Sequence, residues 1–263
     1  MLKLLGAITF VFLGISGLAW TLFHDERVMR IEREEVSHSL STNSSMDQII
    51  APEPEPKPET KVTITLPKSI HHNVPFTSQA PTAEWGKQIF QDGCEEASVL
   101  MVKAWRDGET LTRESAFKKI SALASWQIKK IGHSVDTDVA DTRQFLLEEY
   151  LDVSDTVLQY DFTLDELIDV TQRGIVIVPT NGRKLGNPNF KNPGPLQHML
   201  VIVGYDASLH EFITNDPGTR KGEGYRYPEA ILYAAIRDYP TGVHLPIDGE
   251  RKALILVLKE QGV

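Results

Sequence analysis

The only cysteine of the 263-residue chain, Cys94, stands in the stretch QDGCEEASVLM, directly after Gly93. A helix is predicted to begin at this cysteine, and the first turn of a helix carries partial positive charge and unpaired N–H groups. Both favour the thiolate, which is the nucleophilic form of cysteine. A free cysteine is also commonly a small buried side chain without chemistry. Partners elsewhere in the chain must decide between a catalytic thiol and simple packing.

A base for this thiol is predicted from two strand-like segments, HMLVIVGYD and HEFITND. If Tyr205 faces His210 across the connecting turn, antiparallel pairing brings His198 to within one position of Asp216. Cross-strand neighbours lie about 5 Å apart, so an imidazole–carboxylate hydrogen bond is expected. A nucleophilic thiol needs a base, and the base needs a partner that orients it and stabilises the imidazolium. Cys94, His198 and Asp216 can fill these three roles.

The other histidines, at positions 24, 37, 71, 72, 133, 210 and 244, form no comparable set with acidic residues. The adjacent pair His71-His72 is not expected to bind metal, because neighbouring residues on an extended chain point to opposite faces. A single cysteine excludes an intramolecular disulfide and a multi-cysteine zinc site. We therefore expect no metal and no cofactor.

The elements that must position these residues follow from hydrophobic spacing and turn residues. Helices are predicted for CEEASVLMVKAW, ending at Asp107-Gly108, for residues 112–132, and for residues 136–151, which begin with helix-capping aspartates. Strands are predicted for TVLQYDF, GIVIVPT, the two segments above and ALILVLK, with helices at TLDELIDVTQRG and YPEAILYAAIRDY. Helices followed by an antiparallel sheet predict an α+β fold.

Charge and composition narrow the class of partner. The formal net charge is −9, and the sequence contains no concentrated run of Lys and Arg. Because phosphate binding needs such a cluster, no nucleic-acid partner is expected.

The N-terminus predicts export. Residues 4–23 contain no charged side chain, which is enough length for a membrane-spanning helix. A cleaved signal peptide is the alternative, with the small residues GLA at 17–19 as its cleavage site. The uncleaved anchor is favoured, because the apolar run exceeds the usual signal core of about 7–15 residues. The expected location is the cell membrane, single-pass, with the folded part extracytoplasmic.

A linker separates this segment from the folded part. The stretch APEPEPKPETK alternates proline with charge, which favours extended chain and resists packing. The predicted organisation is an anchor or signal peptide at residues 1–24, a disordered linker at 25–69, and one folded domain at 70–260.

Three motifs in order resemble the cysteine-peptidase family that cleaves bacteriocin leaders after a double glycine. They are VPFTSQAP…QDGCEEASVLM, NGRKLGNPNF…PGPLQHMLVIVGYD and FITNDPGT, and they are most similar to the stand-alone bacterial branch, the peptidase C39-like family. The resemblance implies a papain-like cysteine peptidase fold. It also implies that Cys94 is the nucleophile, His198 the general base and then acid, and Asp216 the orienting acid.

The resemblance further implies a glutamine that helps to hold the oxyanion alongside a backbone N–H. Gln79 ends the V-P-x-x-x-Q-like motif of the family, Gln88 has the usual spacing of six residues before the cysteine, and Gln91 lies three before it. Gln79 is the predicted donor, because a loop can lengthen while its ends stay in place, and Gln91 is the second choice.

Two glutamates follow the cysteine where the family usually has glycine. Glu95 and Glu96 fall in the first helical turn, where acidic side chains suit the helix dipole, and this capping role is the favoured interpretation. Binding of a basic substrate group is the alternative. The two carboxylates would also raise the pKa of the thiol.

The sequence therefore predicts a membrane-anchored, extracytoplasmic cysteine hydrolase that acts on a peptide or protein substrate through a Cys-His-Asp triad. A cell-wall peptidoglycan amidase or endopeptidase is the alternative within the enzyme class. A catalytically silent papain-like binding module is the alternative outside it. Leader cleavage is not expected, because the chain carries no transporter machinery.

Overall fold

The computed structural model describes residues 68–249 and 251–259. The predicted membrane segment at 4–23, and the predicted linker up to residue 67, lie outside the described residues. Within the described part of the chain, no helix combines the length and the apolar character needed to cross a membrane.

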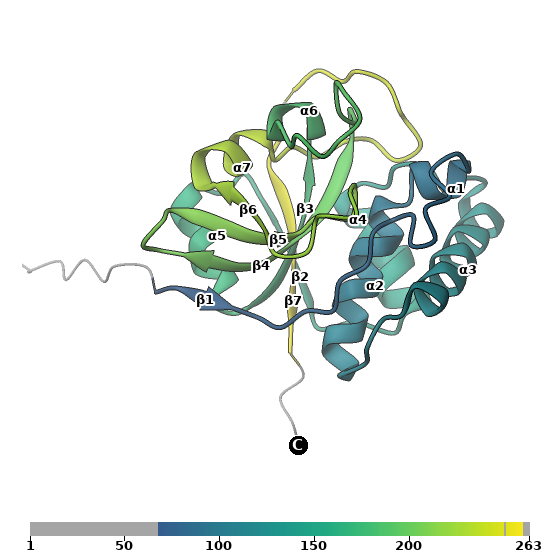
Figure 1. The fold of residues 1–263 in the computed structure, drawn as a ribbon, viewed down its shortest axis with the longest axis horizontal. Helices are drawn as coiled ribbons and strands as arrows, with labels where there is room; N and C mark the ends of the chain where they lie inside the picture. Colours follow the sequence, from purple (N-terminus) through teal and green to yellow (C-terminus); the bar gives the residue numbers. More distant parts are fainter. Residues whose placement is uncertain (1–67, 250, 260–263) are drawn as a thin grey trace, which may run out of the picture. The chain divides into compact units, whose positions relative to one another are not determined.

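In this part of the chain, helices follow one another after the short strand β1, and most of the strands come later (Figure 1). The helices are α1 (Gln88–Gln91), α2 (Cys94–Asp107), α3 (Arg113–Ile131), α4 (Val139–Asp141), the π-helix η1 (Thr142–Tyr150), α5 (Leu164–Thr171), α6 (Gly182–Leu185) and α7 (Glu229–Ala235). The strands are β1 (Ile70–His71), β2 (Thr156–Tyr160), β3 (Gly174–Thr180), β4 (His198–Asp206), β5 (Glu211–Asn215), β6 (Tyr225–Pro228) and β7 (Ala253–Leu258).

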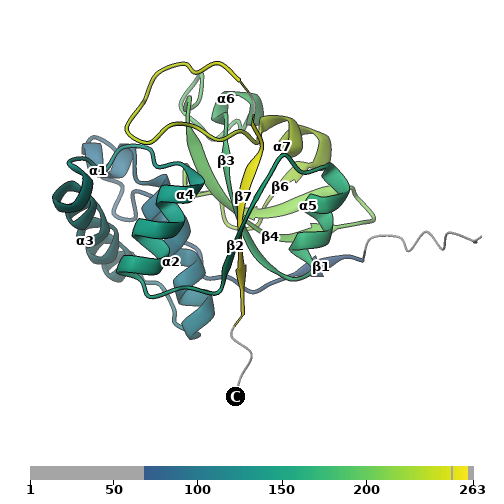
Figure 2. The same cartoon turned by 180° about the vertical axis from the view of Figure 1, so that it is seen from behind.

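The strands form one antiparallel sheet of seven strands in the order β2-β7-β3-β4-β5-β6, with β1 paired to β4. One face of the central strands packs against α2 and η1, and the opposite face packs against α5 and α7. Figures 1 and 2 show these two helical layers on opposite sides of the sheet. The predicted α+β class is confirmed. Burial on both faces explains why β3, β4 and β7 read as continuous hydrophobic runs.

The first two predicted helices are confirmed as α2 and α3, and local sequence explains where α2 ends and where α3 begins and ends. Helix α2 stops where Gly108 adopts a left-handed conformation with φ of 69°. Helix α3 begins at a capping box, in which the Thr112 hydroxyl accepts a hydrogen bond from Ser115 N–H, and it stops at the left-handed Gly132. Cys94 is the first residue of α2, as predicted, and Gly93 is its N-cap.

The third predicted helix begins later than expected. It was predicted from residue 136, but helical structure starts at Val139, where the Asp138 carboxylate accepts a hydrogen bond from Asp141 N–H at 2.7 Å. Asp138 is thus a helix-capping aspartate, whereas the prediction for Asp136 is wrong: this residue has a positive φ of 33° and lines a cavity. The strand β6 and the short helices α1 and α6 were not predicted.

Candidate active site

Cys94 begins α2 at a point where the backbone approaches the short helix α1 very closely. A Cβ atom built on Gly93 would lie 2.6 Å from the carbonyl oxygen of Ile89, so any larger residue there would force α1 to move. The glycine therefore lets the chain enter α2 against α1. The Cys94 side chain is buried, but it reaches the wall of a cavity.

His198 and Asp216 form a buried pair. Nε2 of His198 lies 2.8 Å from Oδ1 of Asp216, and the two side chains are 2% and 0% exposed. His198 is the first residue of β4, and Asp216 follows the last residue of β5. The two residues predicted from the hairpin are therefore in contact.

The pairing used to predict that contact is wrong. Tyr205 pairs with Phe212 and not with His210, and an irregularity between Ile202 and Gly204 shifts the register again toward His198, at the beginning of β4. Regular pairing stops at Asn215, so the turn after β5 carries the Asp216 carboxylate back to the imidazole.

Both oxygens of the Asp216 carboxylate are occupied. Oδ2 accepts hydrogen bonds from Tyr227 Oη at 2.6 Å and from Asn187 Nδ2 at 3.2 Å, while Oδ1 also accepts the Gly218 N–H at 2.9 Å. Burial raises the pKa of Asp216, but the charge and hydrogen bond of His198, with the bond from Tyr227, lower it below its usual value overall. The carboxylate is therefore ionised at neutral pH.

Two of these supporting residues were missed in the sequence. Tyr227 lies on the unpredicted strand β6, and Asn187 belongs to the motif NGRKLGNPNF, which drew attention without a role for any single residue. Asn187 also donates to Tyr227 Oη at 2.8 Å, so the two side chains brace one another beneath Asp216.

The imidazole of His198 is fixed from two further sides. The ring of Phe190 packs edge-on against it with centroids 5.3 Å apart. A Cβ atom on Gly218 would lie 2.9 Å from Cε1 of His198, so this glycine permits the turn after β5 to close over the ring. Because Nε2 is bound to Asp216, Nδ1 is the ring nitrogen that remains for a thiol or a substrate.

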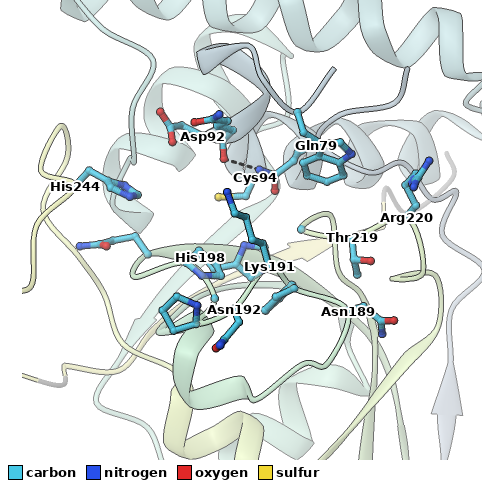
Figure 3. Close-up of a pocket in the computed structure, with 18 of the residues that line it drawn as sticks. Gln79, Asp92, Cys94, Asn189, Lys191, Asn192, His198, Thr219, Arg220 and His244 are labelled. Atoms are coloured by element: carbon cyan, nitrogen blue, oxygen red, sulfur yellow. Dashed lines mark hydrogen bonds between the residues drawn. The ribbon is translucent and has the colours of Figure 1, made fainter. Parts of the chain in front are cut away.

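Cys94 and His198 line one cavity of about 960 Å³. Figure 3 shows Cys94 on the upper wall, from α2, and His198 on the lower wall, from β4. Gln79 and Gln91 line the same cavity, whereas Gln88 does not. Within residues 68–249 and 251–259, no group of three or more His, Cys, Asp or Glu side chains is arranged to hold a metal ion.

The comparison with protein families agrees with this arrangement. The sequence matches the Peptidase_C39 like family over residues 71–239, which is more than half of the chain. The chain belongs to the Peptidase_C39 like family. Membership indicates a cysteine-peptidase type of function and a peptide or protein substrate, and it confirms the family predicted from the motifs. A search of curated proteins found no match.

Gln79 differs from the expectation that the family resemblance set. Its Nε2 donates hydrogen bonds to the carbonyl oxygens of Phe90 at 3.0 Å and Gln91 at 2.6 Å, while its Oε1 is buried with no partner among the described residues. Its own backbone N–H donates to Pro217 O at 2.9 Å, which ties this segment to the turn after Asp216. In this structure the side-chain amide therefore binds the C-terminal end of α1, shortly before Cys94.

Glu95 and Glu96 lie in the first turn of α2, where acidic side chains suit the helix dipole, but both side chains are buried and bind other side chains. Glu95 Oε2 accepts a hydrogen bond from the Cys94 thiol at 3.1 Å, and Oε1 accepts the Tyr239 hydroxyl at 2.7 Å. Glu96 Oε1 accepts from Gln127 Nε2 at 2.5 Å. Neither glutamate lines the cavity, so neither is placed to meet a basic substrate group.

Burial and two acidic neighbours, Glu95 and Asp136, determine the ionisation of the Cys94 thiol. Burial is the largest cause that raises the pKa of Cys94 well above its usual value, and the charges of Glu95 and Asp136 raise it further. Burial and the charge of Asp136 also raise the pKa of Glu95, to about 7. The expectation that the glutamates disfavour the thiolate holds for Glu95, and the resting thiol is neutral.

A second histidine–carboxylate pair faces the same cavity. Nδ1 of His244 lies 2.7 Å from Oδ2 of Asp136, and both residues line the cavity near Cys94. The expectation that no other histidine belongs to a comparable set is therefore wrong for His244, which has both a carboxylate partner and a place in the cavity that Cys94 lines. No signal in the sequence connects the two residues, which are 108 positions apart.

Proposed function

We propose that this chain is a cysteine hydrolase that cleaves peptide or amide bonds. In this proposal Cys94 is the nucleophile, His198 carries protons, and Asp216 holds the imidazole in place. The observation that carries it is the buried 2.8 Å contact between His198 Nε2 and Asp216 Oδ1, in a cavity that Cys94 also lines. Membership of the Peptidase_C39 like family supports the reaction type.

The proposed reaction begins with a neutral thiol. His198 Nδ1 takes the proton of Cys94, and the sulfur electron pair forms a bond to the substrate carbonyl carbon while the carbonyl oxygen becomes an oxyanion. The imidazolium, stabilised by ionised Asp216, returns that proton to the leaving nitrogen as the C–N bond breaks. Water then hydrolyses the thioester with the same histidine as base, and the thiol is regenerated.

The oxyanion needs hydrogen-bond donors close to the thiol. The unpaired N–H groups in the first turn of α2 are one proposed source. Gln79 remains our proposed side-chain donor, and substrate binding would have to turn its Nε2 away from the carbonyl oxygens of Phe90 and Gln91. Gln91, which is exposed and lines the cavity, is the second candidate.

Hydrolysis of a defined peptide mixture by the full-length protein, read by mass spectrometry, tests the proposal. Cleavage that Cys94→Ala abolishes is the expected result, because the chain has no second thiol. A thiol-directed electrophile adds an independent readout. Labelling of Cys94 at neutral pH that depends on His198 supports an enzyme, whereas the slow rate of an ordinary buried thiol in both proteins supports a silent binding module. Cleavage retained by Cys94→Ala would refute the enzymatic proposal.

We further propose that residues 4–23 anchor the protein in the membrane with the folded domain outside the cytoplasm. The uncharged run of twenty residues supports this proposal. Sequencing the N-terminus of the protein from membrane fractions provides the test. An intact N-terminus is expected, and a mature protein that begins near residue 20 would contradict the anchor.

A further inference from the structure

Three cationic side chains line the cavity without an acidic partner. They are Lys191, in the segment before β4, and Arg220 and Lys221, in the turn after β5. All three residues are exposed, and none of them belongs to an ion pair with any other residue of the described chain. Their charges therefore remain available to a ligand in the cavity.

A surface arginine close by in the chain does have acidic partners. Arg226 on β6, only a few positions further along the chain, pairs with Asp206 at 3.0 Å and with Glu211 at 3.2 Å. Other exposed cations, such as Lys118, also lack an ion pair among the described residues, so the distinguishing feature of the three cations is that they line one cavity together.

The carboxylates of the cavity do not neutralise these cations. Asp136 is bound to His244, and Asp92 accepts a hydrogen bond from Gln88 Nε2. In Figure 3, Asp92 and His244 lie on the left side of the cavity and Arg220 on the right, with Cys94 and His198 between them. Arg220 thus lies across the cavity from Asp92 and His244, and Lys191 lies between them near the centre of the view.

The net charge of the whole chain is opposite in sign to the charge of these three side chains. With a net charge of −9, the protein repels anionic molecules at long range, although salt limits that effect to about 8 Å. An acidic substrate would therefore need cations at the point of contact. Arginine suits this task, because its guanidinium can donate two parallel hydrogen bonds to one carboxylate.

We propose that Lys191, Arg220 and Lys221 select peptide substrates that carry a carboxylate close to the scissile bond. The proposal rests on the proposed function, since it concerns the same cavity. The carboxylate can belong to an aspartate or glutamate side chain or to the C-terminus of a short peptide, and the same three cations would bind either.

The test uses full-length protein and matched peptides. A peptide mixture first identifies a bond whose cleavage depends on Cys94. Peptides built around that bond then carry Glu or Gln at each flanking position, and a further pair carries a free or an amidated C-terminus. We expect kcat/KM to be on the order of tenfold higher for a carboxylate peptide than for its neutral match, and the ratio to fall as salt is added.

Charge reversal assigns the preference to residues. Arg220→Glu should remove or invert the preference for carboxylate. Lys118→Glu makes the same change in net charge on the exposed face of α3, where Lys118 lies outside the cavity, and should leave the preference unchanged. A Glu-over-Gln preference identifies a side-chain carboxylate as the ligand, and a preference for the free C-terminus alone identifies the terminal one.

Three results would overturn the proposal. Equal cleavage of every matched pair, with Cys94→Ala inactive toward all of them, removes the substrate preference and leaves the proposed function standing. A loss of preference in Lys118→Glu as large as that in Arg220→Glu would assign the effect to net charge and not to the cavity. Absence of any Cys94-dependent cleavage would refute the proposed function and this inference together.

Discussion

Two histidine–carboxylate pairs face one cavity with almost the same contact distance, 2.8 Å for His198–Asp216 and 2.7 Å for His244–Asp136. Their surroundings differ sharply. The His198 side chain is 2% exposed, whereas that of His244 is 46% exposed. The His198 imidazole lies between β4, the turn after β5 and the phenyl ring of Phe190, whereas His244 lies in the loop between α7 and β7.

The pKa values of the two carboxylates shift in opposite directions. Hydrogen bonds and the neighbouring His198 lower the pKa of Asp216 despite its burial. Burial raises the pKa of Asp136, and the charge and hydrogen bond of His244 only partly offset the increase. Contact distance alone therefore does not identify the pair that can stabilise an imidazolium. The hydrogen bonds that Asp216 Oδ2 accepts from Tyr227 and Asn187 identify that pair.

The largest expected effect separates the two histidines. His198→Ala should lower turnover by about 10²–10⁴-fold, since it removes the group that accepts and returns the proton. His244→Ala should cost much less, because an exposed imidazole bound to a carboxylate of raised pKa is a poor substitute base. Steady-state hydrolysis of the same peptide by both variants makes the comparison, and equal losses would show that the pairs share the role.

Replacing the two aspartates should give the next largest effects, and each replacement should change a different property. Asp216→Asn should lower turnover by less than His198→Ala does, because a thiol depends less on the third member of a triad than a serine does. Asp136→Asn should instead lower the pKa of Cys94, since it removes a negative charge that raises that pKa. The pH dependence of Cys94 alkylation measures the shift, and a pKa that rises in Asp136→Asn would contradict the electrostatic account.

Glu95 gives a smaller effect, and one on stability. Burial and Asp136 raise its pKa to about 7, so between its unfolded value of about 4.3 and 7 the folded state holds the proton more tightly. Protonated Glu95 makes its full contribution to the free energy of unfolding below about pH 4.3, and this contribution is lost as the pH rises through 7. Glutamine cannot lose a proton at this position. The gain in the free energy of unfolding of Glu95→Gln over the wild type should therefore be about 1–3 kcal/mol larger at pH 8 than at pH 5. Urea unfolding at both pH values tests this, and an equal effect at the two would contradict it.

Tyr227→Phe should have the smallest effect. It removes the 2.6 Å hydrogen bond to Asp216 Oδ2 but leaves Asn187 as a donor to the same oxygen. We expect a loss of about 1–2 kcal/mol in unfolding free energy and a modest fall in turnover. The matched control is Tyr233→Phe, whose hydroxyl donates to Phe162 O on the far face of the sheet. A fall in turnover as large in the control would assign the effect to stability alone.

Local signals explain what could be predicted from the sequence. Gly93 and Gly108 delimit α2 and so place Cys94, and the chain of helices and strands follows from hydrophobic spacing. The hairpin register could not be predicted, because β4 is buried on both faces and has no alternation of polar and apolar residues to fix the pairing.

Contacts between distant segments explain the rest. Glu95 is buried because Tyr239, 144 positions away, donates to it, and a rule for exposed helix ends cannot anticipate that partner. Asp136 meets His244 through two irregular loops, where no periodicity relates sequence to position. The pair that was predicted from the sequence, His198 and Asp216, lies at neighbouring ends of two adjacent strands. Antiparallel pairing brings these ends together even when the predicted register is wrong.

The central claim is that the His198–Asp216 pair, and not His244–Asp136, activates Cys94. The most direct measurement is the rate of Cys94 alkylation between pH 5 and pH 9 in the wild type, His198→Ala and His244→Ala. The account predicts that His198→Ala loses labelling near neutral pH and reacts only as the solution becomes alkaline, while His244→Ala labels like the wild type. Loss of neutral-pH labelling in His244→Ala, with His198→Ala unchanged, would contradict it.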